Sequence, residues 1–316
     1  MLDVLRINLV SPLTLCFALG LFARAIRSQL ALPRDLYNSL SIYLLFALGL
    51  KGGVELSHSP LAQLAAPAAV TMLLGCLTPV SAYFVLRRLG RFGIADAAGI
   101  AAHYGSVSAV TFIAAQQFTE RTGAPAEGVL VALVVALEIP AILLGLALAK
   151  GGGGIDRKAL AEVLTGRTAV LLLGGLAIGA IAGQKGIRAV DEMYFQLFQG
   201  TLMLFMLDMG MVAAAQLRQL RQGALRLVAF GTVVPLVHGF AGTLAGHLAG
   251  LSPSGATVFG TMVASASYIA APASVRNALP EADAGRCVTA ALGITFPFNL
   301  ALGIPAYAAF SAWLVP

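Results

Sequence analysis

Two acidic residues lie well inside apolar stretches of this sequence, where a carboxylate could bind a cation or carry a proton. Of the fourteen Asp and Glu residues, only Glu138 and Asp208 have such positions, and the others lie in polar loops or near the ends of apolar runs. A charge at the centre of a membrane costs roughly 2.5 to 3.5 kcal/mol, so each must face other helices or a water-filled path. Both are therefore candidate ion sites.

Glu138 has a second feature that favours ion chemistry. Pro140 follows it by two residues and cannot donate a backbone hydrogen bond, so a carbonyl oxygen one turn earlier becomes free near the carboxylate. This arrangement favours a cation or proton site, the alternative being a protonated or hydrogen-bonded carboxyl that only packs. Asp208 lies nearer the end of its apolar run, and for it both interpretations stay open.

Small and polar residues interrupt two apolar runs. The first interruption is His103-Tyr104-Gly105-Ser106-Val107-Ser108, and the second is Ser265-Ala266-Ser267-Tyr268, followed by Ala270-Ala271-Pro272. Gly, Ser and Pro allow a helix to unwind, which leaves half-helix N-termini that bind anions and opposite ends whose carbonyls suit Na⁺. The alternative is that these serines make ordinary contacts between helices.

The composition places these residues in a membrane protein. Of the 316 residues, 59% are hydrophobic and 11% charged, and the mean hydropathy is +0.88, whereas about a quarter of a soluble domain is charged. Because no nucleophile elbow, P-loop or dinucleotide fingerprint is present either, we predict no enzymatic activity and no cofactor beyond a coupling ion. The four His and three Cys show no metal-ligand spacing, and the net charge of +6 is expected to set membrane topology rather than to bind nucleic acid.

Long apolar runs separated by charged or Pro/Gly-rich breaks predict an all-α protein with ten membrane-spanning helices. They cover residues 8–26, 36–53, 61–86, 94–118, 128–149, 168–182, 195–216, 225–250, 255–275 and 284–313. The interrupted runs are the fourth and the ninth. No room is left for a separate soluble domain.

The first five runs resemble the second five. Residues 1–149 form one half and residues 168–316 the other, joined by the polar segment 150–167, and matching motifs keep an offset near 160 residues. The matches are Gly20-Leu21 with Gly175-Leu176, Leu48-Gly49-Leu50 with Met209-Gly210-Met211, Gly99 with Gly260, and Glu138-Ile139-Pro140 with Thr295-Phe296-Pro297. Because five is odd, the second half must enter the membrane from the opposite side, as in many secondary transporters.

The basic residues predict the orientation. The loops after the first, third, fifth, seventh and ninth runs carry 15 of the 20 Lys and Arg residues, and the other side carries 5. The positive-inside rule therefore places the joint 150–167 in the cytoplasm and both termini outside.

Three motifs resemble the sodium-dependent bicarbonate transporter family of bacteria and cyanobacteria. They are Tyr104-Gly105-Ser106-Val107-Ser108-Ala109-Val110-Thr111, Glu138-Ile139-Pro140-Ala141, and Ala264-Ser265-Ala266-Ser267 with Pro272, Arg276 and Pro280 downstream. The resemblance covers most of the chain. It implies a core domain with two crossed broken helices, a gate domain, a homotrimer in the bacterial inner membrane, and Na⁺-coupled bicarbonate uptake by an elevator-like movement.

The site residues follow from this resemblance and from the interior acids. The anion is expected at Gly105, Ser106, Ser108, Ser265 and Ser267, and the cation at Thr111, Glu138, Tyr268 and Thr295, with Asp208 as a second interior acid. Two positions depart from the family pattern. Tyr268 replaces an Asp that could help to hold Na⁺, and Glu138 replaces an Asp while keeping its charge.

Other functions remain alternatives. The family's long cytoplasmic insert is missing, so docking of its regulatory signalling protein is not expected. A Na⁺- or H⁺-coupled carrier of another small anion or carboxylate is the nearest alternative. A non-transporting receptor or scaffold is the alternative from another class, although it would have no reason to bear the cost of two broken helices and interior acids.

Overall fold

The computed structural model is all-helical, with no β-strand among the residues that it describes, which are Arg6, 8–57, 64–149, Ala161, 164–218 and 224–315. Eight helical segments in these ranges are long and apolar enough to cross a membrane. The predicted class, a multi-pass all-α membrane protein, is confirmed. Most of the predicted joint 150–167 lies outside the described residues.

Helices cover the described part of every predicted apolar run, apart from the interruptions in the fourth and ninth, and their ends differ by a few residues from those expected. The first half contains α2 (Pro12–Ala25), α3 (Arg34–Leu56), α4 (Ala65–Arg88), α5 (Ile94–Gly105), α6 (Ala109–Arg121) and α7 (Leu130–Ala149). The second half contains α9 (Arg167–Ile187), the short helices Arg188–Val190 and Glu192–Gln196, α10 (Phe198–Arg218), α11 (Ala224–Leu248), α12 (Pro253–Val263) and α13 (Ala271–Ala278).

The last predicted span, 284–313, is a composite helix that the sequence pattern did not foresee. It consists of α14 (Ala284–Val288), α15 (Phe296–Phe298) and α16 (Ile304–Leu314), joined by the π-helical stretches Thr289–Thr295 and Asn299–Gly303. π-Helical turns are rare and occur frequently at functional sites.

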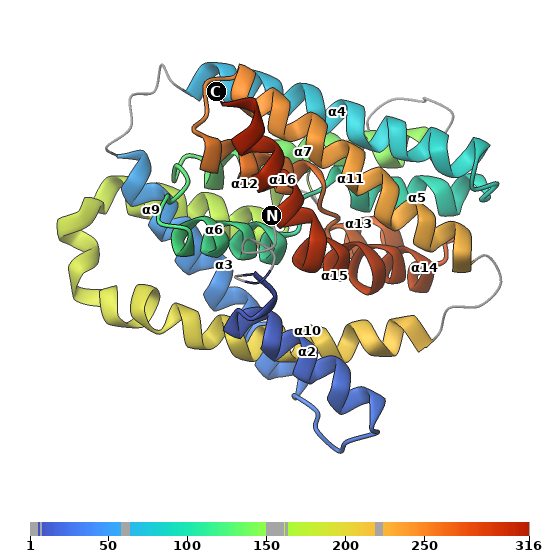
Figure 1. Ribbon diagram of the computed structural model, residues 1–316, viewed down its shortest axis with the longest axis horizontal. Coiled ribbons are helices and arrows are strands. Elements are labelled where there is room, and N and C mark those ends of the chain that lie inside the picture. The colour runs from blue at the N-terminus through green and yellow to red at the C-terminus, as the bar shows by residue number, and fades with distance from the viewer. Residues whose placement is uncertain are drawn as a thin grey trace.

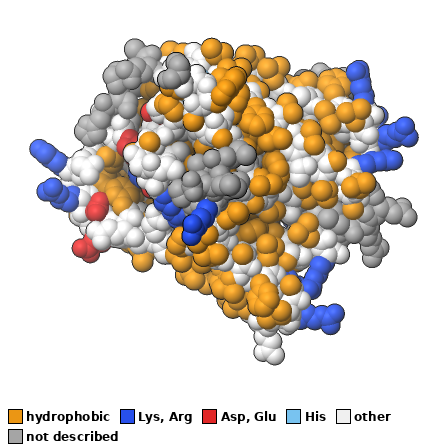
Figure 2. Space-filling model, in the orientation of Figure 1, with side chains coloured by type: hydrophobic (Ala, Val, Ile, Leu, Met, Phe, Trp, Pro, Cys, Tyr) orange, Lys and Arg blue, Asp and Glu red, His pale blue; other side chains and the backbone are white. Residues whose placement is uncertain are grey.

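The long helices run across the view in Figure 1, with α4 and α11 along one side and α10 with α2 along the opposite side. Figure 2 shows apolar side chains over most of the middle of this face, whereas most of the basic side chains in view project at its left and right ends. Several large apolar side chains are highly exposed; Ile181 is 87% exposed and Leu225 is 82% exposed. This distribution is the one expected of a protein whose middle contacts lipid.

Glycines bring two helix pairs into close contact: α2 packs along α10, and α3 along α9. A methyl group on Gly20 would lie 2.1 Å from the Leu207 carbonyl oxygen of α10, and one on Gly179 would lie 2.2 Å from the Leu50 carbonyl oxygen of α3. Small residues at such contacts let backbones approach where lipid offers no hydrophobic driving force between helices. These four helices therefore form a tightly packed unit.

We expect Gly179→Ala to destabilise the protein by about 1 to 3 kcal/mol, because its new methyl group overlaps α3. Gly174→Ala, on the same helix, is the matched control, since nothing lies within 4 Å of the position where its methyl group would be. The control should be neutral or slightly stabilising, because Ala favours helix. Thermal unfolding in detergent measures both. Equal stability of the two variants would contradict the close α3–α9 contact.

Candidate functional site

Both interruptions predicted from the sequence are breaks between half-helices. The first separates α5 from α6, and the second separates α12 from α13. In Figure 1, α5 and α13 lie to the right of these breaks, with α6 and α12 to the left. Two hydrogen bonds join the breaks: Ser267 N–H donates to the His103 carbonyl at 2.8 Å, and Ser108 N–H donates to Ser265 Oγ at 2.9 Å. Backbone groups freed in one helix are thus satisfied by the other.

Serine hydroxyls also cap both half-helices that begin after a break. Ser108 Oγ accepts from Thr111 N–H at 3.2 Å, and Ser267 Oγ accepts from Ala270 N–H at the same distance. The N–H groups of Ala109 and Val110, in the first turn of α6, have no acceptor among the described residues. The N-terminus of α6 therefore keeps two free donors at the positive end of a helix dipole, which is suited to an anion.

The four predicted anion-site serines divide into two kinds. Ser265 accepts from Ser108 N–H and donates to the Met262 carbonyl, so both of its roles are used. Ser106 donates its hydroxyl proton to Glu138 Oε1 at 3.2 Å. Ser108 Oγ accepts one backbone N–H and Ser267 Oγ accepts two, those of Ala270 and Ala271, so each hydroxyl keeps its proton to donate. These two serines are therefore the better candidates for direct contact with an anion.

A cavity of about 690 Å³ opens beside the breaks. Glu138 of α7 lines it, and so does Tyr268 from the second break. Its other lining residues are Tyr37, Asn38, Ile142, Thr165, Gly166, Arg167, Thr168, Ala169, Ile269, Ala270, Pro272, Ser274, Arg276 and Asn277. The cavity therefore connects the only predicted mid-span carboxylate with a mouth that carries two arginines.

Tyr268 lies between this cavity and the N-terminus of α6. It lines the cavity, it lies near Ser108, and its ring packs edge-on against Phe296 with centroids 5.6 Å apart. The side chain is 8% exposed, and its hydroxyl has no hydrogen-bond partner among the described residues. A buried hydroxyl without a partner in the protein is free to bond with a ligand or water.

The composite last helix anchors both half-helices that end at the breaks. Tyr104, at the end of α5, donates to the Ala290 carbonyl at 3.1 Å, and its oxygen lies 2.6 Å from Thr295 Oγ1. Asn299 Nδ2, one turn after Thr295, donates to the Ala264 carbonyl at the end of α12 at 2.9 Å. Thr295 and Asn299 thus fix the two broken helices relative to each other.

Proline explains one further contact of Thr295. Pro235 in α11 has no N–H to donate to the Gly231 carbonyl, and Thr295 Oγ1 donates to that carbonyl instead, at 2.7 Å. The Thr295 hydroxyl is therefore engaged with α5 and α11, and its predicted role as a cation ligand stays a prediction.

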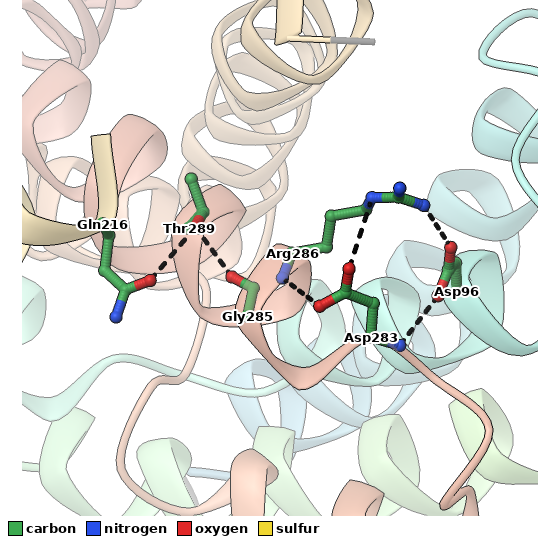
Figure 3. A network of polar contacts seen from close by, with 6 residues as sticks. All are labelled: Asp96, Gln216, Asp283, Gly285, Arg286 and Thr289. Carbon is green, nitrogen blue, oxygen red and sulfur yellow. Dashed lines mark hydrogen bonds and ion pairs between the residues drawn. The ribbon is translucent and has the colours of Figure 1, made fainter. Parts of the chain in front are cut away.

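The start of α5 is tied to the last helix as well (Figure 3). Arg286 of α14 pairs with Asp96 at 2.6 Å, and the other oxygen of Asp96 accepts from Asp283 N–H at 2.8 Å. Thr289 Oγ1 also donates to Gln216 Oε1 of α10, at 3.2 Å. Since α5 is held at both ends, its C-terminus has a fixed position at the break.

The remaining predicted site residues have different surroundings. Gly105 lies against α7 and α4, where an added methyl group would be 2.5 Å from Ala141 Cβ. Thr111 is buried in the first turn of α6, with its N–H on Ser108. Asp208 is buried on α10 near Tyr37, and it is not among the residues that line the cavity.

A second polar group, at the other end of α3, was not foreseen from the sequence. Lys51 pairs with Glu120 of α6 at 2.7 Å, and Gln117 donates to the second oxygen of Glu120 at 2.9 Å. Gln199 of α10 donates in turn to Gln117. We call these four residues the polar cluster. They line a smaller cavity of about 180 Å³ together with Tyr194, Phe195 and Phe198.

An apolar helical bundle with two broken helices bonded to each other beside an interior cavity has the organisation of a membrane transporter. Comparison with known families agrees: the model of the Na⁺-dependent bicarbonate transporter superfamily matches residues 12–312. The chain belongs to this superfamily, as the sequence motifs predicted. No curated protein gives a significant match to the sequence.

We expect Ser265→Ala to act on stability, because it removes the acceptor of the buried Ser108 N–H. An unpaired buried donor costs about 1 to 3 kcal/mol, which thermal unfolding in detergent would measure. Ser274→Ala is the matched control: Ser274 is also buried and near the second break, but its side chain makes no hydrogen bond within the described chain. A Ser265→Ala protein as stable as this control would contradict the bond between the breaks.

Proposed function

We propose that this protein is a Na⁺-coupled bicarbonate transporter of the bacterial inner membrane that works by alternating access with an elevator-like movement. The observation that carries the proposal is the asymmetry of the two cavities. The large cavity reaches Glu138 and Tyr268 near the helix breaks, whereas the cavity beside the polar cluster and its aromatic neighbours, at the other end of α3, is much smaller. A site open to one side and closed to the other is what alternating access requires.

The basic residues indicate which side is open. Arg167 and Arg276, at the mouth of the large cavity, are next to the fifth and ninth loops, both on the side rich in Lys and Arg. Contacts among other loops of that side support the assignment: Arg218 donates to the Ala25 carbonyl, and Arg226 donates to the Gly90 carbonyl. By the positive-inside rule, the large cavity opens to the cytoplasm and both termini lie outside.

The packing supports the proposed inverted repeat. If the repeat is real, α2 corresponds to α9 and α3 to α10, so the α3–α9 pair must recur as α10–α2, and both pairs are present. The glycines that match between the two halves form these contacts, since Gly20 packs against Gly210 and Gly49 packs against Gly175. The repeat also makes α5 correspond to α12 and α7 to α14, so a contact between α5 and α14 should recur between α12 and α7. At the starts of these helices, Asp96 accepts from Asp283 N–H, and Glu127 accepts from Ser252 N–H at 2.7 Å.

Ten membrane-spanning helices follow from this repeat. The eight long segments, the shorter α2, and α12 with α13 as one broken span make ten. The close unit α2, α3, α9 and α10 is the proposed gate domain, and the broken helices with α4, α7, α11 and the last helix are the proposed core domain. The homotrimer remains an implication of the family, and no binding of nucleic acid or of a signalling protein is proposed.

Charge gives the coupling a physical reason. Free N–H groups at the start of α6 favour a small anion, while Glu138, in the cavity beside the same break, repels it. A cation at Glu138 would remove this repulsion, so anion and cation should bind together. The same reasoning allows a H⁺-coupled carrier or another small anion as the alternative. A scaffold gains no support, since a cavity that reaches an interior carboxyl serves no scaffolding purpose.

We expect Glu138→Gln to abolish the stimulation of labelled-bicarbonate uptake by Na⁺ in proteoliposomes, because an amide keeps the shape but not the charge. If Glu138 carries a proton instead, the variant should lose pH dependence with an unchanged response to Na⁺. Asp208→Asn is the matched control, since it neutralises a buried acid that does not line the cavity and should keep Na⁺ stimulation. Wild-type response of Glu138→Gln to both Na⁺ and pH would contradict the coupling role.

The polar cluster should separate whenever the outer side opens. We therefore expect that joining residues 117 and 199 stops uptake. Gln117→Cys and Gln199→Cys, in a protein with Cys16, Cys76 and Cys287 replaced, would be linked by a short bifunctional thiosulfonate reagent. Uptake should return when the link is reduced. The single variant Gln117→Cys treated in the same way is the control, and normal uptake by the linked protein would rule out movement at this contact.

A further inference from the structure

We propose that Tyr268 binds the transported anion directly, as a hydrogen-bond donor that acts together with the free N–H groups at the N-terminus of α6. This inference rests on the proposed function and assigns Tyr268 a role different from the cation ligand expected from its position. The ligand class is a small monovalent oxyanion, of which bicarbonate is the proposed example.

Three independent observations place a donor where the anion needs one. The Tyr268 hydroxyl is buried near the Ser108 side chain and makes no hydrogen bond of normal geometry with any described residue, although its side chain lines the large cavity. It lies near Ser108, the N-cap of α6. Immediately after that cap, Ala109 and Val110 hold N–H groups that no described residue accepts. The phenol hydroxyl and two backbone N–H groups thus offer three donors close to Ser108, and the Tyr268 side chain also reaches the cavity.

The chemistry of a phenol favours an anion over Na⁺. A neutral phenol has a proton to donate and carries no negative charge, whereas proteins bind hard cations mainly through carboxylates, carbonyls and water. The edge-on contact with Phe296 also fixes the ring, so less conformational entropy is lost when the hydroxyl binds. Tyr268 therefore determines which ligand fits: it suits an oxyanion with an acceptor oxygen at this point.

Charges around the cavity agree with this division of roles. Glu138 lines the same cavity but bonds with Ser106 of the first break, which leaves the cation on the α7 side. Arg167 and Arg276 line the mouth, where they would attract an anion without contacting the buried site. The anion at α6 and the cation at Glu138 can then occupy neighbouring positions and attract each other.

The test is equilibrium binding of radiolabelled bicarbonate to purified wild-type protein and Tyr268→Phe, at saturating Na⁺ and over a range of Na⁺ concentrations. Removing one donor to a charged group should weaken bicarbonate binding roughly 10- to 100-fold, with an unchanged Na⁺ concentration for half-maximal effect. Tyr37→Phe, which changes another tyrosine that lines the cavity, is the control and should bind as wild type does.

A second variant tests the backbone donors. Ala109→Pro removes one free N–H at the first position of a helix, where proline is well tolerated, and it should also weaken bicarbonate binding. Unchanged bicarbonate affinity in Tyr268→Phe would overturn the proposal whatever Ala109→Pro does, as would a Tyr268→Phe protein that loses only its response to Na⁺. If wild-type protein binds no bicarbonate with or without Na⁺, the proposed function itself fails, and this assignment fails with it.

Discussion

The structure depends on one constraint, which is that backbone groups freed by a break inside a membrane must find partners. Each unpaired N–H or C=O in hydrocarbon costs several kcal/mol, so a single broken helix would be unstable by itself. Here two broken helices meet, and Ser267 N–H to the His103 carbonyl and Ser108 N–H to Ser265 Oγ join them. The breaks stabilise each other, and the backbone N–H groups of Ala109 and Val110 at the start of α6 remain for a ligand.

The surrounding helices hold the crossing, which is the point where the two broken helices meet. The last helix bonds with the end of α5 through Thr295 and with the end of α12 through Asn299, and its π-helical stretches include both residues. Proline in α11 supplies the free carbonyl that orients Thr295. The α2, α3, α9 and α10 unit is held by glycine contacts, packs against the last helix through α10, and lines both cavities through α3. A rigid crossing beside a separate unit is suited to movement of one against the other.

Local composition explains what the sequence could predict. Apolar runs located the helices, Gly and Ser located the breaks, and the position of Glu138 inside an apolar run marked it as an interior acid. Contacts between distant segments could not be predicted in this way. Lys51 and Glu120 are 69 residues apart, and nothing in either run indicates that they meet. Asn299 was a missed signal, because an amide inside an apolar span needs a partner just as an acid does. Which cavity is open is a property of the conformation, which composition does not encode.

The account claims that one anion and one cation share the site at the helix crossing and favour each other's binding. The most direct test is thermal unfolding of wild-type protein in detergent, titrated with bicarbonate in Na⁺ and in K⁺ at equal pH and ionic strength. Coupling between sites is reciprocal and typically changes affinity about 5- to 150-fold. We predict that bicarbonate raises the unfolding midpoint at much lower concentrations in Na⁺ than in K⁺, and that bicarbonate strengthens Na⁺ binding by the same factor. Identical bicarbonate titrations in the two salts would contradict the claim.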